Sequence, residues 1–190
     1  MSLNPLPLAF SEFLAGLTRS TVTPVLHIPD FFAPAISSEA EDFFQTLPLE
    51  PLIHDGIVAR HEAAVAGGET RASTGLAAVI KHVAGRIGYR DSHSIEHCAF
   101  AYAPGQSVPE HQDTPRHALV AMGYFGKFEG GRYAYRDPSD QDIQLDLSAG
   151  DLLVCVNSLG TGVALRPMHR VDPITSGRRL VLAASYVRSD

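Results

Sequence analysis

The sequence predicts a mainly β fold with flanking helices, an α+β arrangement built on a sandwich or jelly roll. Helical patterns are confined to the first half, whereas residues from Ser94 onward form short β-like runs. Glycine- or proline-containing turns separate these runs, and many short strands at such spacing are typical of sandwiches and jelly rolls. We expect strands at residues 94–103, 107–113, 117–125, 131–136, 141–147, 151–157, 163–171 and 178–188.

The first half predicts a preamble of helices and strands over about residues 5–93. The clearest element is a helix at 76–87, whose apolar residues repeat at helical spacing. Ser73 or Thr74 could cap it, and Gly88 ends it. The other expectations are a helix within 5–19, a strand at 23–32, a helix from the serines at 37–38 to about 46, a strand at 53–62, and a loop at 63–72.

Length and composition indicate a single domain, 1–190, whose β-rich part spans about 94–188. A chain of 190 residues can bury one core, and a net charge of −6 argues against general nucleic-acid binding. The two cysteines, Cys98 and Cys155, form no paired motif, which favours two reduced, buried thiols and a cytoplasmic location. No run of residues is long and apolar enough to predict a membrane span. The composition is compatible with a homodimer.

The triplet His111-Gln112-Asp113 is the first candidate for chemistry. If it lies in a strand, His111 and Asp113 point to the same face, because side chains alternate. A second imidazole, His169, would complete a two-histidine, one-carboxylate set that suits Fe(II) and leaves coordination positions open. The triplet alone is a weak signal, since a histidine and an aspartate can simply share a hydrogen bond in a strand.

The motifs around this triplet strengthen its interpretation as part of a metal site. In order, the chain has Tyr102-Ala-Pro-Gly-Gln before His111-Gln-Asp113, then Glu-Gly-Gly at 129–131, Gly-Asp-Leu-Leu at 150–153, and His169-Arg-Val-Asp-Pro-Ile-Thr-Ser-Gly-Arg-Arg179. Across residues 94–188 this pattern resembles the 2-oxoglutarate, Fe(II)-dependent dioxygenases, specifically their prolyl 4-hydroxylase-like branch. The resemblance implies a double-stranded β-helix core with the N-terminal helices packed on one face. The glycine pair at 130–131 is a turn signal in its own right and predicts a hairpin.

The resemblance implies roles for individual residues. His111, Asp113 and His169 would be the iron ligands, and therefore the catalytic centre. The arginine that binds the distal carboxylate of 2-oxoglutarate lies nine or ten residues after the second histidine in such proteins, and both positions are arginine here, Arg178 and Arg179. Arg179 is preferred because small residues, Val181, Ala183 and Ser185, share its face. The phenols of Tyr102 and Tyr124 are further candidates for contact with the cosubstrate.

The implied reaction is the hydroxylation of an unactivated C–H bond with Fe(II), O2 and 2-oxoglutarate, giving succinate and CO2. The resemblance also admits ascorbate as an additional cofactor. Relatives act on protein side chains, and other branches act on amino acids or small metabolites, so a peptide and a small molecule both remain open as substrates. Segments 53–72, 137–142 and 157–166 are expected to decide between them.

Two departures and several alternatives accompany this interpretation. The link between Gly150 and His169 is longer than in the family, and residues 157–166 could border the substrate mouth. The last strand carries Ala-Ser-Tyr at 184–186 where many relatives have tryptophan. A cupin-like metal enzyme would share the fold, but its His-x-His pair and later glutamate are absent. A non-catalytic jelly-roll binding module is the third alternative. His169, the arginines and the two tyrosines could also be ordinary core or surface residues.

Overall fold

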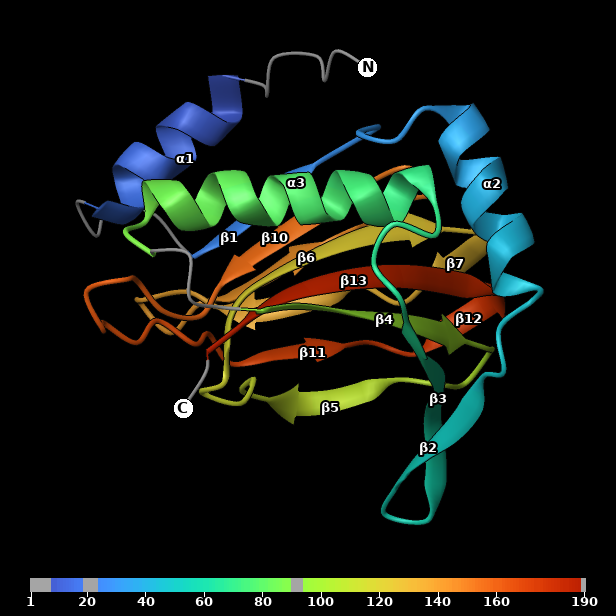
Figure 1. Ribbon diagram of the computed structural model, residues 1–190. Coiled ribbons are helices and arrows are strands. Elements are labelled where there is room, and N and C mark those ends of the chain that lie inside the picture. Colours follow the sequence, from blue (N-terminus) through green and yellow to red (C-terminus); the bar gives the residue numbers. More distant parts are fainter. Residues whose placement is uncertain (1–7, 19–23, 90–93, 189–190) are drawn as a thin grey trace.

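The computed structural model describes residues 8–18, 24–89 and 94–188. Its three helices are α1 (Leu8–Thr18), α2 (Pro34–Phe44) and α3 (Arg71–Arg86). Figure 1 shows α3 lying across one face of the strands, with α1 and α2 near its two ends. The predicted arrangement, a β core with N-terminal helices on one face, is confirmed.

The strands form two main sheets and a small one. The seven-stranded sheet has the order β1-β10-β6-β13-β4-β3-β2, the four-stranded sheet has the order β5-β11-β8-β9, and β12 pairs with β7. Every pairing is antiparallel, as in a double-stranded β-helix. The strand bounds are β1 Val25–Ile28, β2 Glu50–His54, β3 Ile57–Val65, β4 Ser94–Tyr102, β5 Val108–His111, β6 His117–Phe125, β7 Phe128–Gly130, β8 Tyr133–Arg136, β9 Asp142–Leu145, β10 Leu152–Val156, β11 His169–Val171, β12 Ile174–Gly177 and β13 Arg179–Val187.

Strand β13 shows how the large sheet separates two cores. Side chains alternate across a sheet, so Leu180, Leu182 and Tyr186 face the helices, in a core that includes the buried side of α3. Val181 faces the other way and joins a second core between the sheets, where Tyr124 and Leu153 are also buried. The helices therefore close one face of the large sheet, and the other face remains available for a site.

Helix α3 begins earlier than the sequence predicted. Its N-cap is Thr70, whose side chain accepts a hydrogen bond from the Ser73 backbone N–H at 3.0 Å. The Ser73 hydroxyl in turn accepts from the Thr70 backbone N–H at 3.1 Å, which completes a capping box. Ser73 is thus the second partner of the box rather than the cap. The left-handed backbone at Gly88, with φ of 92°, follows the helix end as expected.

Replacement of Thr70 by alanine should lower the free energy of unfolding by about 1 kcal/mol, because the first turn of α3 loses a side-chain partner in a buried position. Urea denaturation followed by circular dichroism measures the change. Thr161→Ala is a suitable control, since Thr161 is exposed in a loop. Equal losses in the two variants would contradict the capping role.

The segment expected to be one strand and a loop, 53–72, is instead part of a hairpin followed by α3. Strands β2 and β3 are joined by Asp55-Gly56, which have φ of 50° and 78°. Asp-Gly favours a tight two-residue turn because both positions need positive φ. The hairpin extends away from the body of the protein in Figure 1. The single-strand prediction was wrong because it ran through this turn signal.

Three smaller expectations were also wrong. Helix α2 has Pro34 at its first turn and no side-chain cap, so the serines at 37–38 lie inside the helix. Gly130 and Gly131 do not form a hairpin, because β7 pairs with β12 while β8 belongs to another sheet. In the run 163–171 only residues 169–171 form a named strand.

The helix predicted within 5–19 and the strand predicted at 23–32 correspond to α1 and β1, and their outermost positions, 5–7, 19 and 23, lie outside the described residues. Among the helices described, none combines the length and the apolar character that crossing a membrane requires.

Candidate metal and cosubstrate site

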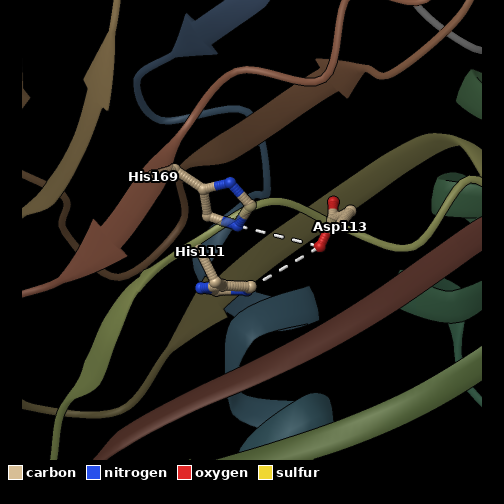
Figure 2. Close-up of side chains that lie close together, drawn as sticks. All are labelled: His111, Asp113 and His169. Carbon is tan, nitrogen blue, oxygen red and sulfur yellow. Dashed lines mark ion pairs between the residues drawn. The ribbon is translucent and has the colours of Figure 1, made fainter.

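Two neighbouring strands of the four-stranded sheet bring the candidate histidines together. His111 is the last residue of β5 and His169 is the first of β11, and the antiparallel register pairs them directly. Their ring centroids lie 4.3 Å apart. Residues 58 positions apart in the sequence thus become cross-strand neighbours, and both rings face Asp113 (Figure 2).

Asp113 reaches this position from outside the strand. Strand β5 ends at His111, so the expectation that His111 and Asp113 share a strand face was wrong. The Asp113 Oδ1 lies 3.9 Å from His111 Nε2 and 3.7 Å from His169 Nε2. One ligand atom from each residue lies within 4.8 Å of the other two. This separation leaves space for one metal ion among the three atoms.

The backbone fixes the orientation of both imidazoles. His111 Nδ1 is 2.9 Å from the carbonyl of Pro109, and His169 Nδ1 is 3.1 Å from the carbonyl of Pro167. A carbonyl can only accept a hydrogen bond, so each Nδ1 carries the proton and each Nε2 presents a lone pair to the cluster. Each histidine follows a Pro-x dipeptide, a repeated pattern that could have linked the two in the sequence.

Burial favours the neutral, metal-binding form of His169. Loss of hydration lowers the pKa of His169, an effect that the nearby Asp113 carboxylate partly opposes. A neutral imidazole can donate its Nε2 lone pair, whereas an imidazolium cannot. Two imidazoles and one carboxylate on one side of a cavity form the donor set that Fe(II) adopts in a facial triad. The residues present therefore fit an iron ion.

A cavity of about 420 Å³ opens beside this cluster, between the two sheets. The alternate residues of β13 line it, namely Arg179, Val181, Ala183 and Ser185, as their common face predicted. The cavity thus connects the His-Asp-His cluster with the side chain of Arg179.

Arg179 is a buried cation without a described acidic partner. Its side chain is 1% exposed, and its guanidinium Nη1 donates to the Gly131 carbonyl at 2.7 Å. The guanidinium carbon lies 4.7 Å from the ring centroid of Tyr124 and 5.1 Å from that of Tyr102. Its Nε has no hydrogen-bond partner, and no carboxylate of the described residues forms an ion pair with it. A buried charge is costly unless it is paired, so this arrangement fits an anionic ligand.

The neighbouring candidates differ in position. Arg178 is exposed and does not line the cavity, so the structure brings only Arg179 to the site. Tyr102 and Tyr124 both line the cavity beside Arg179. Burial raises the pKa of Tyr124, so its phenol stays protonated at neutral pH and can donate a hydrogen bond.

Two residues near the candidate metal ligands were not singled out from the sequence. The ring of Tyr133 stacks on His169 with centroids 5.4 Å apart, and its hydroxyl is 3.3 Å from Cys155 Sγ. Asn157 donates to Asp113 Oδ2 at 2.9 Å. Neither has a local sequence signal, because each contact joins strands or loops that are distant in the chain.

The far side of the cavity is formed partly by the β2–β3 hairpin. Arg60 lies over the ring of Phe100, 4.4 Å from its centroid, and forms an ion pair with Glu62 at 3.1 Å. All three line the cavity. The segments 137–142 and 157–166 contribute no lining residue, so of the three segments expected at the mouth only 53–72 reaches it.

Comparisons with known proteins support the fold. No family model and no curated protein sequence matches the chain. A prolyl-4-hydroxylase structure from Pseudomonas putida matches with a TM-score of 0.74 at 18% identity, covering 96% of this chain and 100% of its own. A Trichoplax adhaerens prolyl hydroxylase, in complex with a hypoxia-inducible factor peptide, matches with a TM-score of 0.69 at 16% identity, covering 93% and 88%. The non-heme alpha ketoglutarate dependent epimerase SnoN, from nogalamycin biosynthesis, matches with a TM-score of 0.66 at 16% identity, covering 95% and 84%.

These structures include hydroxylases and an epimerase, so the shared architecture does not by itself define the reaction. What they have in common with the chain is the overall fold. The chain therefore has the fold of the 2-oxoglutarate, Fe(II)-dependent oxygenases.

Proposed function

We propose that the protein is a 2-oxoglutarate- and O2-dependent Fe(II) oxygenase that hydroxylates an unactivated C–H bond, with residues 1–190 acting as one catalytic domain. The observation that carries the proposal is the pair of features in one cavity: a His-Asp-His cluster and a buried arginine with no acidic partner among the described residues. A metal site alone would fit many proteins. An unpaired cation beside it calls for a ligand that is anionic and can also reach the metal.

In this proposal His111, Asp113 and His169 hold Fe(II), and Arg179 pairs with the distal carboxylate of 2-oxoglutarate. The bound iron and cosubstrate supply the oxidising chemistry, in which 2-oxoglutarate and O2 are converted to succinate and CO2 as the substrate is hydroxylated. Burial raises the pKa of Tyr124, so its phenol keeps the proton and can donate a hydrogen bond to the same carboxylate. The aromatic rings around Arg179 exclude water, so the local dielectric constant is low. The attraction between the guanidinium and the carboxylate of the ligand is therefore stronger than it would be in water.

The substrate is proposed to enter from the side of the β2–β3 hairpin. The charged side chains that line the cavity here form ion pairs, Arg60 with Glu62 and Glu96 with Arg116. The cavity lining also includes apolar side chains such as Val120 and Met122. This lining supports an uncharged C–H-bearing group at the reacting position, carried by a peptide, an amino acid or a small metabolite.

Anaerobic protein mixed with Fe(II) and 2-oxoglutarate should develop a visible metal-to-ligand absorption band, and O2 should then release succinate when a substrate is present. Succinate in place of 2-oxoglutarate is a matched control, because it keeps a carboxylate for Arg179 but lacks the keto oxygen needed for chelation. Absence of the band, together with absence of succinate formation, would reject the proposal. A protein that bound neither iron nor 2-oxoglutarate would instead support a non-catalytic binding module.

A further inference from the structure

Asn157 connects the carboxylate ligand to the end of β10. It is the first residue after this strand and is 2% exposed. Its side-chain amide nitrogen donates to Asp113 Oδ2 at 2.9 Å and to the backbone carbonyl of His117 at 2.9 Å. Both partners are acceptors, so the NH2 group, rather than the amide oxygen, must face them.

Because of this contact, the two carboxylate oxygens of Asp113 have different neighbours. Oδ2 is engaged by Asn157, whereas Oδ1 is the atom that lies nearest to both histidine Nε2 atoms (Figure 2). A carboxylate that ligates through both oxygens would take an additional coordination position. A site that must also accept a chelating cosubstrate and O2 needs three positions open.

We propose that Asn157 is a positioning residue that restricts Asp113 to ligation through Oδ1. The inference rests on the proposed metal site and deepens it. Hydrogen bonds from outside the ligand set commonly orient metal ligands in this way, and their loss typically weakens metal binding about 10–100-fold.

The backbone around Asn157 is held firmly enough for this role. Its N–H donates to the Ala118 carbonyl at 2.9 Å, and its carbonyl accepts from Leu165 N–H at 2.8 Å and Arg166 N–H at 3.1 Å. Gln112, which lies between two of the candidate ligands, donates from its side chain to the Arg166 carbonyl at 2.8 Å. The long segment 157–166 thus closes on itself and is connected to the metal-ligand triplet at two points.

The same segment is also attached to the end of α3. Gly160 N–H donates to the Ile87 carbonyl at 2.9 Å, and the hydroxyls of Ser158 and Tyr89 lie 2.6 Å apart. A side chain at position 160 would collide with the backbone of Gly88, so glycine permits this close approach. The long segment 157–166 therefore connects α3 with Asp113 and does not form part of the substrate mouth.

Asn157→Leu tests the inference, because leucine has nearly the same shape but cannot donate. The affinity for Mn(II), measured by electron paramagnetic resonance titration of the protein without cosubstrate, should fall about 10–100-fold. The spectrum of the Mn(II)-saturated variant should also differ from that of the wild type, since Asp113 is no longer held. A purely structural role would lower the thermal midpoint but leave the spectrum of the saturated protein unchanged.

Thr161→Ala is the matched control, because Thr161 is exposed in the same segment, and the variant should keep the Mn(II) affinity and spectrum of the wild type. If Asn157→Leu does not fold, as judged by circular dichroism, Asn157→Ala carries the same expectation. Wild-type affinity and spectrum in the folded variant would overturn the role of Asn157. Failure of the wild type itself to bind Mn(II) would overturn the proposed metal site instead.

Discussion

Replacement of Asp113 by alanine is expected to abolish metal binding and, with it, all turnover of 2-oxoglutarate. Asp113 is the only carboxylate of the cluster, and the remaining His111 and His169 contribute imidazole nitrogens. The loss of Mn(II) affinity should exceed the roughly 10–100-fold typical of residues outside the ligand set. Electron paramagnetic resonance titration measures it directly and needs no substrate.

Asp146→Ala is the control for general effects of removing a carboxylate. Asp146 is 85% exposed in its side chain, pairs only with Arg132 among the described residues, and does not line the cavity. Its loss should leave metal affinity unchanged. Asp113→Asn adds a test of charge at constant shape and should also lose the metal. Wild-type Mn(II) affinity in either Asp113 variant would place the ion elsewhere in the protein.

The architecture could be predicted from local signals because most turns between the strands contain residues that favour a turn. Glycine and proline mark the ends of the strands, and the alternation along β13 correctly placed Arg179 with Val181 on the cavity face. Arg178, expected within this strand, instead lies just before it and is exposed. The hairpin turn at Asp55-Gly56 carried an equally clear signal and was overlooked.

Other features of the site depend on contacts that no local pattern encodes. Asp113 lies beyond the end of β5, and its carboxylate is oriented by Asn157, which is 44 residues away. The glycine pair at 130–131 was expected to turn a hairpin, yet Gly131 supplies the carbonyl that accepts from Arg179. Such relations arise only when the two sheets close around the cavity, so the sequence could predict the candidate ligand residues but not the residues that orient them.

Replacement of Arg179 by methionine should have opposite effects on binding and on stability. Removing one partner of a buried ion pair costs about 2 kcal/mol or more, which corresponds to an increase of about 30-fold or more in the dissociation constant for 2-oxoglutarate. Without cosubstrate, however, Arg179 is a buried charge whose Nε lacks a partner, and methionine avoids that desolvation cost. The free energy of unfolding of the ligand-free variant should therefore be equal to or higher than that of the wild type.

Thermal unfolding with and without 2-oxoglutarate, in the presence of Mn(II), separates the two effects. Saturating cosubstrate should stabilise the wild type, by about 2.7 kcal/mol at 100 times its dissociation constant, and should stabilise Arg179→Met much less. Arg178→Met is the matched control, because Arg178 is exposed outside the cavity and should change neither quantity appreciably. A ligand-free Arg179→Met protein that was strongly destabilised would mean that the arginine is held for its contacts with Gly131 and the two tyrosines. The opposite result would mean that the fold tolerates an unpaired buried charge in order to bind an anion.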